Sequence, residues 1–159
     1  MAWKKDDLIP ESEIKIKVTD ATVEFAKRFG SYLGKNDQRS EKDRNGKPKQ
    51  IKESKLTTSQ LRKFFGEVKK QQMNGYDETD LVLLKPKLAY AVGRTAAGGK
   101  KDTFYKINDF YFVISRAIDC VKADSKEESE KRFHNFIKVF EAIVAYHKAA
   151  EESKLNDNQ

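Results

Sequence analysis

The chain has 159 residues, of which 38% are apolar and 36% are charged. This size suits one core, so we expect residues 1–159 to form a single domain. No apolar run approaches the roughly 18 residues of a membrane helix, and the N-terminus lacks the apolar segment of a signal peptide. We therefore expect a cytoplasmic protein with no membrane partner.

The net charge of +7 is concentrated in two blocks. Residues 35–70 contain 12 basic and 5 acidic side chains, and residues 85–106 contain 6 basic side chains against one acidic side chain, Asp102. Concentrated positive charge favours a polyanionic partner, most often nucleic acid, because binding releases the counterions of the polyanion. A lysine-rich surface that only solubilises the protein is the alternative.

The N-terminal part of the chain contains one predicted helix. We expect the chain to be loose up to Pro10, and residues 14–18 fit either a short extended piece or the approach to a helix. The pattern then predicts a helix over 20–33, with Thr19 as its cap and Gly34 as its stop.

Residues 35–54 contain Ile51 as their one apolar side chain, together with many charges. Such a segment cannot bury enough surface to order itself. We therefore predict a flexible charged loop at about 35–55, and no stretch of the chain has a clear strand pattern.

Apolar residues at helical spacing predict two helices in the middle of the chain. The first covers 58–73, where Thr57 and Gln60 have the spacing of a capping box. The second covers 79–94 and contains Pro86, which either kinks this helix or lies in the first turn of a shorter one.

The last part of the chain predicts two more helices. One begins at Phe104 and stops near Asp124, and a long helix then opens at a capping box of Ser125 and Glu128 and reaches about Ser153. The fold class is therefore all-α: a single compact bundle of about five antiparallel helices with a long C-terminal helix and loose termini.

The sequence shows no constellation of an enzyme. It has no glycine loop for phosphate, no pair of Cys or His at metal spacing and no nucleophile motif. His147 continues the apolar stripe of the long helix, which favours a packing role, and Cys120 is expected to be a small buried residue. We expect no catalysis, no metal and no cofactor.

The helix over 58–73 carries basic residues beside its apolar face. At about 100° per residue, Arg62 and Lys69 form one column and Lys63 and Lys70 another, with Gly66 between them. A glycine in mid-helix costs about 0.5 to 1 kcal/mol relative to alanine. Gly66 therefore indicates close approach of either a phosphate backbone or a neighbouring helix.

The next helix places Lys87, Tyr90 and Arg94 within about 60° of one another, away from its leucines. Two cations with an aromatic ring between them suit a sugar–phosphate backbone with an exposed base or ribose. A core role for the tyrosine is the alternative.

Three segments, residues 56–62 (LTTSQLR), 84–94 (LKPKLAYAVGR) and 136–146 (FIKVFEAIVAY), resemble in sequence and order the small subunit of the type III-A CRISPR effector, the Csm complex. The resemblance implies a non-catalytic, all-helical subunit that stacks in several copies in this antiviral ribonucleoprotein. It would line the channel that holds the guide RNA and its target RNA, beside the large signalling subunit and the backbone subunits.

Carried onto this chain, the resemblance makes Arg62 and Arg94 the strongest candidates for RNA contact, supported by Lys63, Lys69, Lys70 and Lys87. Binding to phosphates and sugars would be independent of sequence. Two other functions stay open: a helix-turn-helix protein that inserts the 58–73 helix into duplex DNA, and a helical adaptor that binds only protein.

Overall fold

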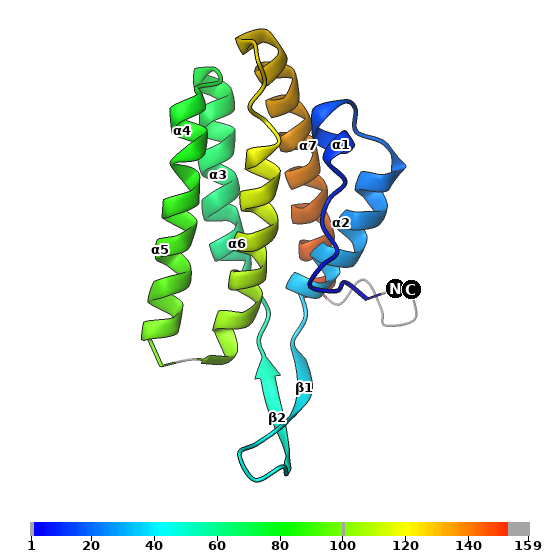
Figure 1. The fold of residues 1–159 in the computed structure, drawn as a ribbon, viewed down its shortest axis with the longest axis vertical. Helices are drawn as coiled ribbons and strands as arrows, with labels where there is room; N and C mark the ends of the chain where they lie inside the picture. The colour runs from blue at the N-terminus through cyan, green and yellow to red at the C-terminus, as the bar shows by residue number, and fades with distance from the viewer. Residues whose placement is uncertain (1, 100, 153–159) are drawn as a thin grey trace.

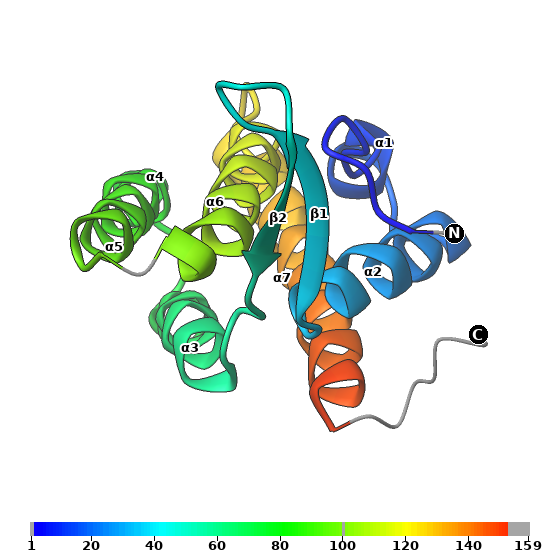
Figure 2. The same cartoon turned by 90° about the horizontal axis from the view of Figure 1, so that it is seen from below.

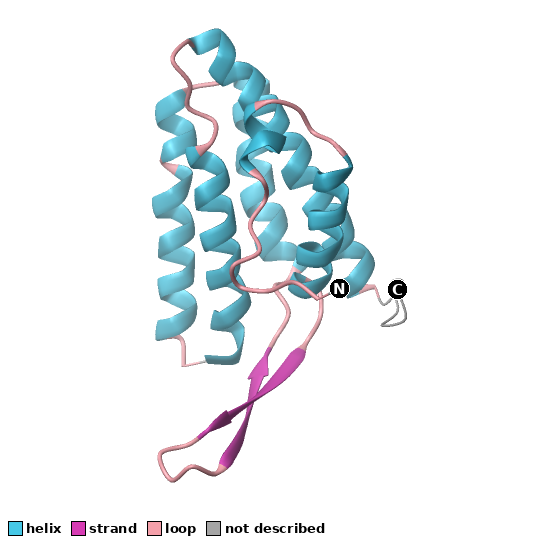
Figure 3. Cartoon of the chain, turned by 45° about the vertical axis from the view of Figure 1, so that its right-hand side comes forward, coloured by secondary structure: helices cyan, strands magenta, loops and turns pink. Residues whose placement is uncertain are grey.

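The computed structural model describes residues 2–99 and 101–152. Its helices stand side by side in an elongated bundle, and a two-stranded hairpin projects from one end (Figures 1 and 3). The elements in chain order are α1 (Glu11–Lys15), α2 (Asp20–Leu33), β1 (Asp37–Lys42), β2 (Pro48–Glu53), α3 (Thr58–Asn74), α4 (Glu78–Val82), α5 (Leu84–Ala97), the 3-10 helix η1 (Lys101–Thr103), α6 (Phe104–Asp119) and α7 (Lys126–Glu151).

Helix α7 forms the centre of the bundle. Seen from below, it lies between α2 on one side and α3 and α6 on the other (Figure 2). Its inward face is a run of buried aromatic side chains, Phe133, Phe136 and Phe140, and each of these rings is at most 2% exposed. This apolar stripe explains why the longest helix of the chain is also the one on which the others pack.

Helices α2 and α7 pack unusually closely, because α2 presents glycines to its partner. A Cβ atom added to Gly30 would lie 2.7 Å from the backbone oxygen of Ile143, and one added to Gly34 would lie 2.5 Å from the backbone oxygen of His147. No real Cβ atom tolerates such distances from a backbone. The two glycines, four residues apart, therefore set the spacing of the two helices.

The predicted helices at 20–33 and 58–73 are confirmed as α2 and α3. Thr19 caps α2 by accepting a hydrogen bond from the Ala21 N–H. The capping box of α3 is also present, since Thr57 accepts from the Gln60 N–H and the Gln60 side chain accepts from the Thr57 N–H.

The predicted helix over 79–94 is divided into α4 and α5 at Leu83. Pro86 is the third residue of α5, so it lies in the first turn, where its missing N–H has no partner to lose. The structure thus settles the two alternatives in favour of a shorter helix with the proline at its start.

Helices α6 and α7 agree with the prediction at their starting residues. Helix α6 begins at Phe104 as expected but ends at Asp119, before the predicted stop. The Ser125 side chain accepts from the Glu128 N–H at the start of α7. The predicted end of this helix at Ser153 lies outside the described residues.

The prediction of an all-α chain with a loop at 35–55 and no strand is wrong in one respect. Strands β1 and β2 pair in antiparallel register from Asp37 with Glu53 to Lys42 with Pro48. The turn between them closes through hydrogen bonds between Asp43 and Lys47, and Gly46 has a φ of 77°, which favours glycine. The Asn45-Gly46 pair is a hairpin signal that the absence of an apolar strand face obscured.

The N-terminal segment, expected to be loose up to Pro10, contributes to the core. Trp3 and Ile9 are 7% and 6% exposed, and the Trp3 ring lies 4.9 Å from Phe29 and 4.8 Å from Tyr32, between ring centroids. Of residues 14–18, the first two end the short helix α1, and the rest form the connection to α2 rather than a strand. Across residues 2–99 and 101–152, no helix is long and apolar enough to cross a membrane.

Candidate nucleic-acid interface

The outer face of α3 is a strip of exposed basic side chains. Leu61, Phe64 and Val68 turn inward and are buried, so the 100° step of the helix turns Arg62, Lys63 and Lys70 outward, where all three are exposed. None of these three cations forms an ion pair with any residue that the structure describes. Their charge is therefore available to a partner.

Gly66 lies in the middle of this strip and is exposed. Apart from the adjoining backbone of α3 itself, no atom of the described residues lies within 4 Å of the position that its Cβ would occupy. One of the two explanations for a glycine here was close packing of a neighbouring helix. Within the described part of this chain, no helix packs against Gly66. The backbone of α3 at Gly66 is open to an external partner.

Two of the predicted contact residues are neutralised within the chain. Lys69 Nζ lies 3.2 Å from a carboxylate oxygen of Glu141 on α7, and Lys87 Nζ lies 3.3 Å from a carboxylate oxygen of Glu67 on α3. Both pairs are partly exposed, so each contributes little to stability. Lys69 and Lys87 nevertheless offer less free charge than Arg62, Lys63 and Lys70.

Helix α5 contributes Tyr90 and Arg94 to the same side of the bundle. The Tyr90 side chain is 68% exposed, which rules out the core role, and the Arg94 guanidinium lies 5.9 Å from the centre of its ring. An exposed ring beside a guanidinium can stack on a base or lie against a ribose.

Arg62 and Arg94 lie toward the same end of the bundle, because α3 and α5 run in opposite directions (Figure 1). The ion pair of Lys87 with Glu67 fixes the register of the two helices. At about 1.5 Å per residue, Arg62 lies about 7.5 Å before Glu67 along α3, and Arg94 lies about 10.5 Å after Lys87 along α5. Because the helices are antiparallel, both displacements point to the same end of the bundle. The two arginines therefore lie at similar levels along the bundle, toward the end from which the hairpin projects.

A buried polar network beneath the hairpin was not predicted. Lys106 is fully buried, and its Nζ donates to the backbone oxygens of Tyr32 and Lys35 at 2.5 and 2.6 Å and to Asp37 at 2.5 Å. Burial lowers the pKa of Lys106, and the Asp37 carboxylate partly offsets this effect. No pattern in the sequence distinguishes this lysine from the many exposed ones.

The carboxyl group of Asp109 extends the network, accepting a hydrogen bond from the Tyr32 hydroxyl at 2.6 Å. Burial raises the pKa of Asp109 despite that hydrogen bond. Arg39 completes the junction, with its Nε 3.1 Å from Glu53 and its guanidinium 4.7 Å from the centre of the Tyr105 ring. These contacts fix the base of the hairpin to the bundle.

His147 and Cys120, for which the sequence predicted packing roles, are both buried. His147 is buried, with its Nε2 2.5 Å from the Leu56 backbone oxygen, and Cys120 is buried with the pKa of its thiol raised to about 11, chiefly by burial. Among the described residues, no group of three or more His, Cys, Asp or Glu side chains has the arrangement of a metal site.

Fold and site together define a helical-bundle protein with exposed basic side chains on α3 and α5 and a hairpin at one end. Residues 35–153, most of the chain, match the family model Csm2 Type III-A, and the chain belongs to this family. It is thus a small subunit of the type III-A CRISPR Csm effector complex, in which it assembles with other subunits, and the family is generally a non-catalytic structural one. No curated protein and no solved structure matches the chain.

Proposed function

We propose that this protein is a non-catalytic subunit that stacks in several copies in the Csm ribonucleoprotein and holds guide and target RNA independently of their sequence. It would act in the cytoplasm, in antiviral defence, beside the large signalling subunit and the backbone subunits. Contact with RNA would come from Arg62, Lys63, Lys70 and Arg94, with Lys69 and Lys87 in support.

The observation that carries this proposal is the strip of unpaired cations on α3 around an open glycine. Arg62, Lys63 and Lys70 are exposed and lack a carboxylate partner among the described residues, while Gly66 leaves the helix backbone accessible. A phosphate chain needs close approach and positive charge, and it needs no shape that reads bases. The strip has both properties.

Duplex DNA is the less favoured ligand. In a helix-turn-helix, a short turn joins the recognition helix to the preceding helix. Here the preceding helix is α2, and the whole β1–β2 hairpin separates it from α3. An adaptor that binds only protein would leave the aligned, unpaired cations of α3 without a role.

A binding experiment with matched variants tests the proposal. The Arg62→Ala/Arg94→Ala variant should keep the wild-type melting temperature and bind single-stranded RNA more weakly at low salt, whatever the RNA sequence. The control is Lys69→Ala/Lys87→Ala, which removes the same charge from cations that are already paired, and which should lose less affinity. Equal affinities of wild type and the arginine variant would refute the site, and preference for one duplex DNA sequence would refute the function.

A further inference from the structure

The β1–β2 hairpin has two chemically different faces. Directly paired residues of antiparallel strands lie on the same face, so the register places Asp37, Arg39 and Glu41 of β1 with Lys49, Ile51 and Glu53 of β2. Arg39, Ile51 and Glu53 on this face are partly or fully buried, and Arg39 contacts Tyr105 of α6. This inner face anchors the hairpin.

All six residues of the opposite face are exposed, and none of them has a carboxylate. Its six side chains are those of Gln38, Ser40, Lys42, Pro48, Gln50 and Lys52. They supply two positive charges and several neutral hydrogen-bonding groups, and only proline is apolar. We call these six residues the open face.

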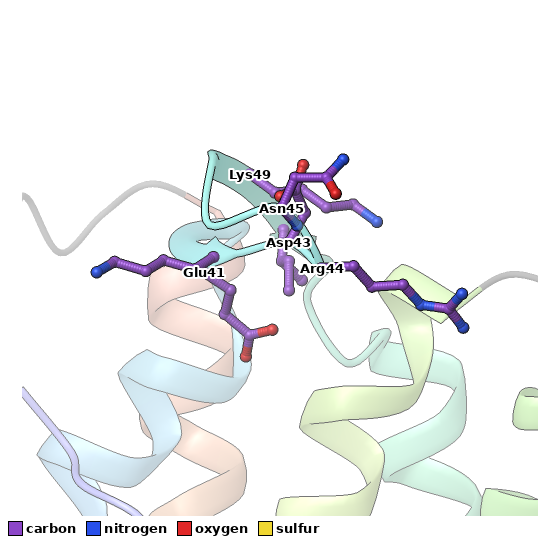
Figure 4. Close-up of a pocket in the computed structure, with 7 residues that line it drawn as sticks. Glu41, Asp43, Arg44, Asn45 and Lys49 are labelled. Carbon is purple, nitrogen blue, oxygen red and sulfur yellow. The ribbon is translucent and has the colours of Figure 1, made fainter.

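The acidic side chains of the hairpin have partners within the chain, whereas most of its basic side chains have none among the described residues. Each carboxylate has a partner within the chain: Asp37 pairs with Lys106, Glu41 and Glu53 pair with Arg39, and Asp43 accepts from the backbone N–H groups of Asn45 and Lys47 at 2.8 and 2.9 Å. By contrast, five cations form no ion pair with any residue in the described ranges: Lys42, Arg44, Lys47, Lys49 and Lys52. Figure 4 shows the Arg44 side chain extended away from the turn.

From this asymmetry we propose that the hairpin is a second RNA-binding element, whose open face and tip contact the sugar–phosphate backbone. Lys42 and Lys52 of the open face, together with Arg44 and Lys47 of the turn, would bind phosphates. The Gln and Ser side chains would hydrogen-bond to phosphate or ribose oxygens. This inference rests on the proposed function and extends the RNA path from α3 and α5 beyond the bundle.

Position and anchoring support the same conclusion. The hairpin leaves the bundle at the end where Arg62 and Arg94 lie (Figure 1). Its base is held by Lys106 and by the Ser54 N–H, which donates to the Asp102 backbone oxygen at 2.8 Å. A projection that is already fixed loses little conformational entropy on binding.

A protein partner fits the open face less well. The cores of protein interfaces are enriched in aromatic residues and depleted in lysine, whereas this face has no aromatic residue and two lysines. Lysines along exposed strands also discourage pairing with a strand of another chain. Phosphate is the ligand that tolerates both features.

The test compares two double variants of the full-length protein. Lys42→Ala/Lys52→Ala removes the open-face charges, and the control Lys126→Ala/Lys131→Ala removes the same charge from exposed positions in the first part of α7, at the opposite end of the bundle. Affinity for single-stranded RNA is measured against salt concentration, with circular dichroism to verify folding. Loss of two phosphate contacts should reduce the slope of log K against log salt by about 1.4, at about 0.7 per contact.

The outcomes separate this proposal from the function on which it rests. A smaller slope for the open-face variant, with the control at the wild-type slope, supports the hairpin contact. Equal slopes for the two variants overturn it, and the proposed function stands if Arg62→Ala/Arg94→Ala still weakens binding. Normal RNA affinity with failure to enter the Csm complex assigns the hairpin to a protein partner and also overturns the proposal. If the wild type shows no salt-dependent RNA binding, the proposed function itself fails.

Discussion

The Lys106 ammonium group on α6 lies 2.5 Å from the Asp37 carboxylate at the first residue of β1. The lysine side chain is 0% exposed and that of the aspartate 46% exposed, so the pair joins the interior of the bundle to the base of the hairpin. A charge in such a position is tolerated because every donor of the ammonium group has an acceptor. The buried Lys106 side chain thereby holds the base of the β1–β2 hairpin.

Lys106→Met should loosen the hairpin more than the bundle. The change removes the donor of three hydrogen bonds, to Asp37 and to the backbone oxygens of Tyr32 and Lys35, while methionine fills much of the volume. Hydrogen exchange at the amides of 38–52 should become faster, with α7 amides unchanged. Lys85→Met is the control, because Lys85 pairs with the exposed Asp119. Unchanged exchange in the hairpin would show that Lys106 does not anchor it.

Glu13 should make stability depend on pH in the acid range. Burial alone would raise the pKa of Glu13, but hydrogen bonds from Thr22 and Thr19 outweigh burial and lower the pKa from its ordinary value of 4.5. A carboxyl group with a lowered folded-state pKa stabilises the protein above the unfolded pKa, and this contribution is lost as pH falls through the folded pKa.

Glu13→Gln should therefore destabilise the protein at pH 7, by about 1.5 to 3 kcal/mol for hydrogen bonds to a charged group. The difference between variant and wild type should shrink as the pH is lowered from 4.5, the ordinary pKa. Urea unfolding at several pH values measures both. Subtracting the variant curve removes the contributions of Asp109 and Glu151, which are common to both proteins. A difference independent of pH would contradict the assignment.

The sequence predicted those elements whose cause is local. The cap at Thr19 and the box of Thr57 with Gln60 are short-range hydrogen bonds, and the helices that they open were located correctly. The hairpin was missed because its strands have no apolar alternation, and tertiary contacts to Tyr105 and Lys106 hold its base in place. Likewise, only the folded chain shows that Lys69 and Lys87 are paired while Arg62 is not.

Trp3 should report on the docking of the N-terminal segment. It is the only tryptophan of the chain, its ring packs on Phe29 and Tyr32, and its indole N–H donates to the Asp7 backbone oxygen at 2.9 Å. Native fluorescence should thus be blue-shifted, and Trp3→Ala should lower the free energy of unfolding by about 3 kcal/mol. Trp3→Phe, which keeps a ring, should lose less. Emission typical of a solvated indole in the native protein would mean that this segment is undocked.

Two glycine substitutions should have opposite effects on stability. Gly30→Ala would place a Cβ 2.7 Å from the backbone oxygen of Ile143 and 2.9 Å from the His147 nitrogen, so α2 and α7 must separate. The expected cost is about 1 to 3 kcal/mol. Gly66→Ala meets open space and should stabilise α3 by about 0.5 to 1 kcal/mol. Thermal melts of the two variants measure both effects.

The more stable Gly66→Ala variant also tests the RNA surface without a loss of folding or of charge. If a phosphate chain passes close to the α3 backbone, the added methyl group should hold it away from Arg62 and Lys70, and RNA affinity should fall while stability rises. Ser59→Ala changes another exposed position of the same helix, about two turns earlier, and is the control for substitution on this helix. If RNA affinity is the same for Gly66→Ala and wild type, the backbone at Gly66 is not approached by RNA, and the contact is made by the long side chains alone.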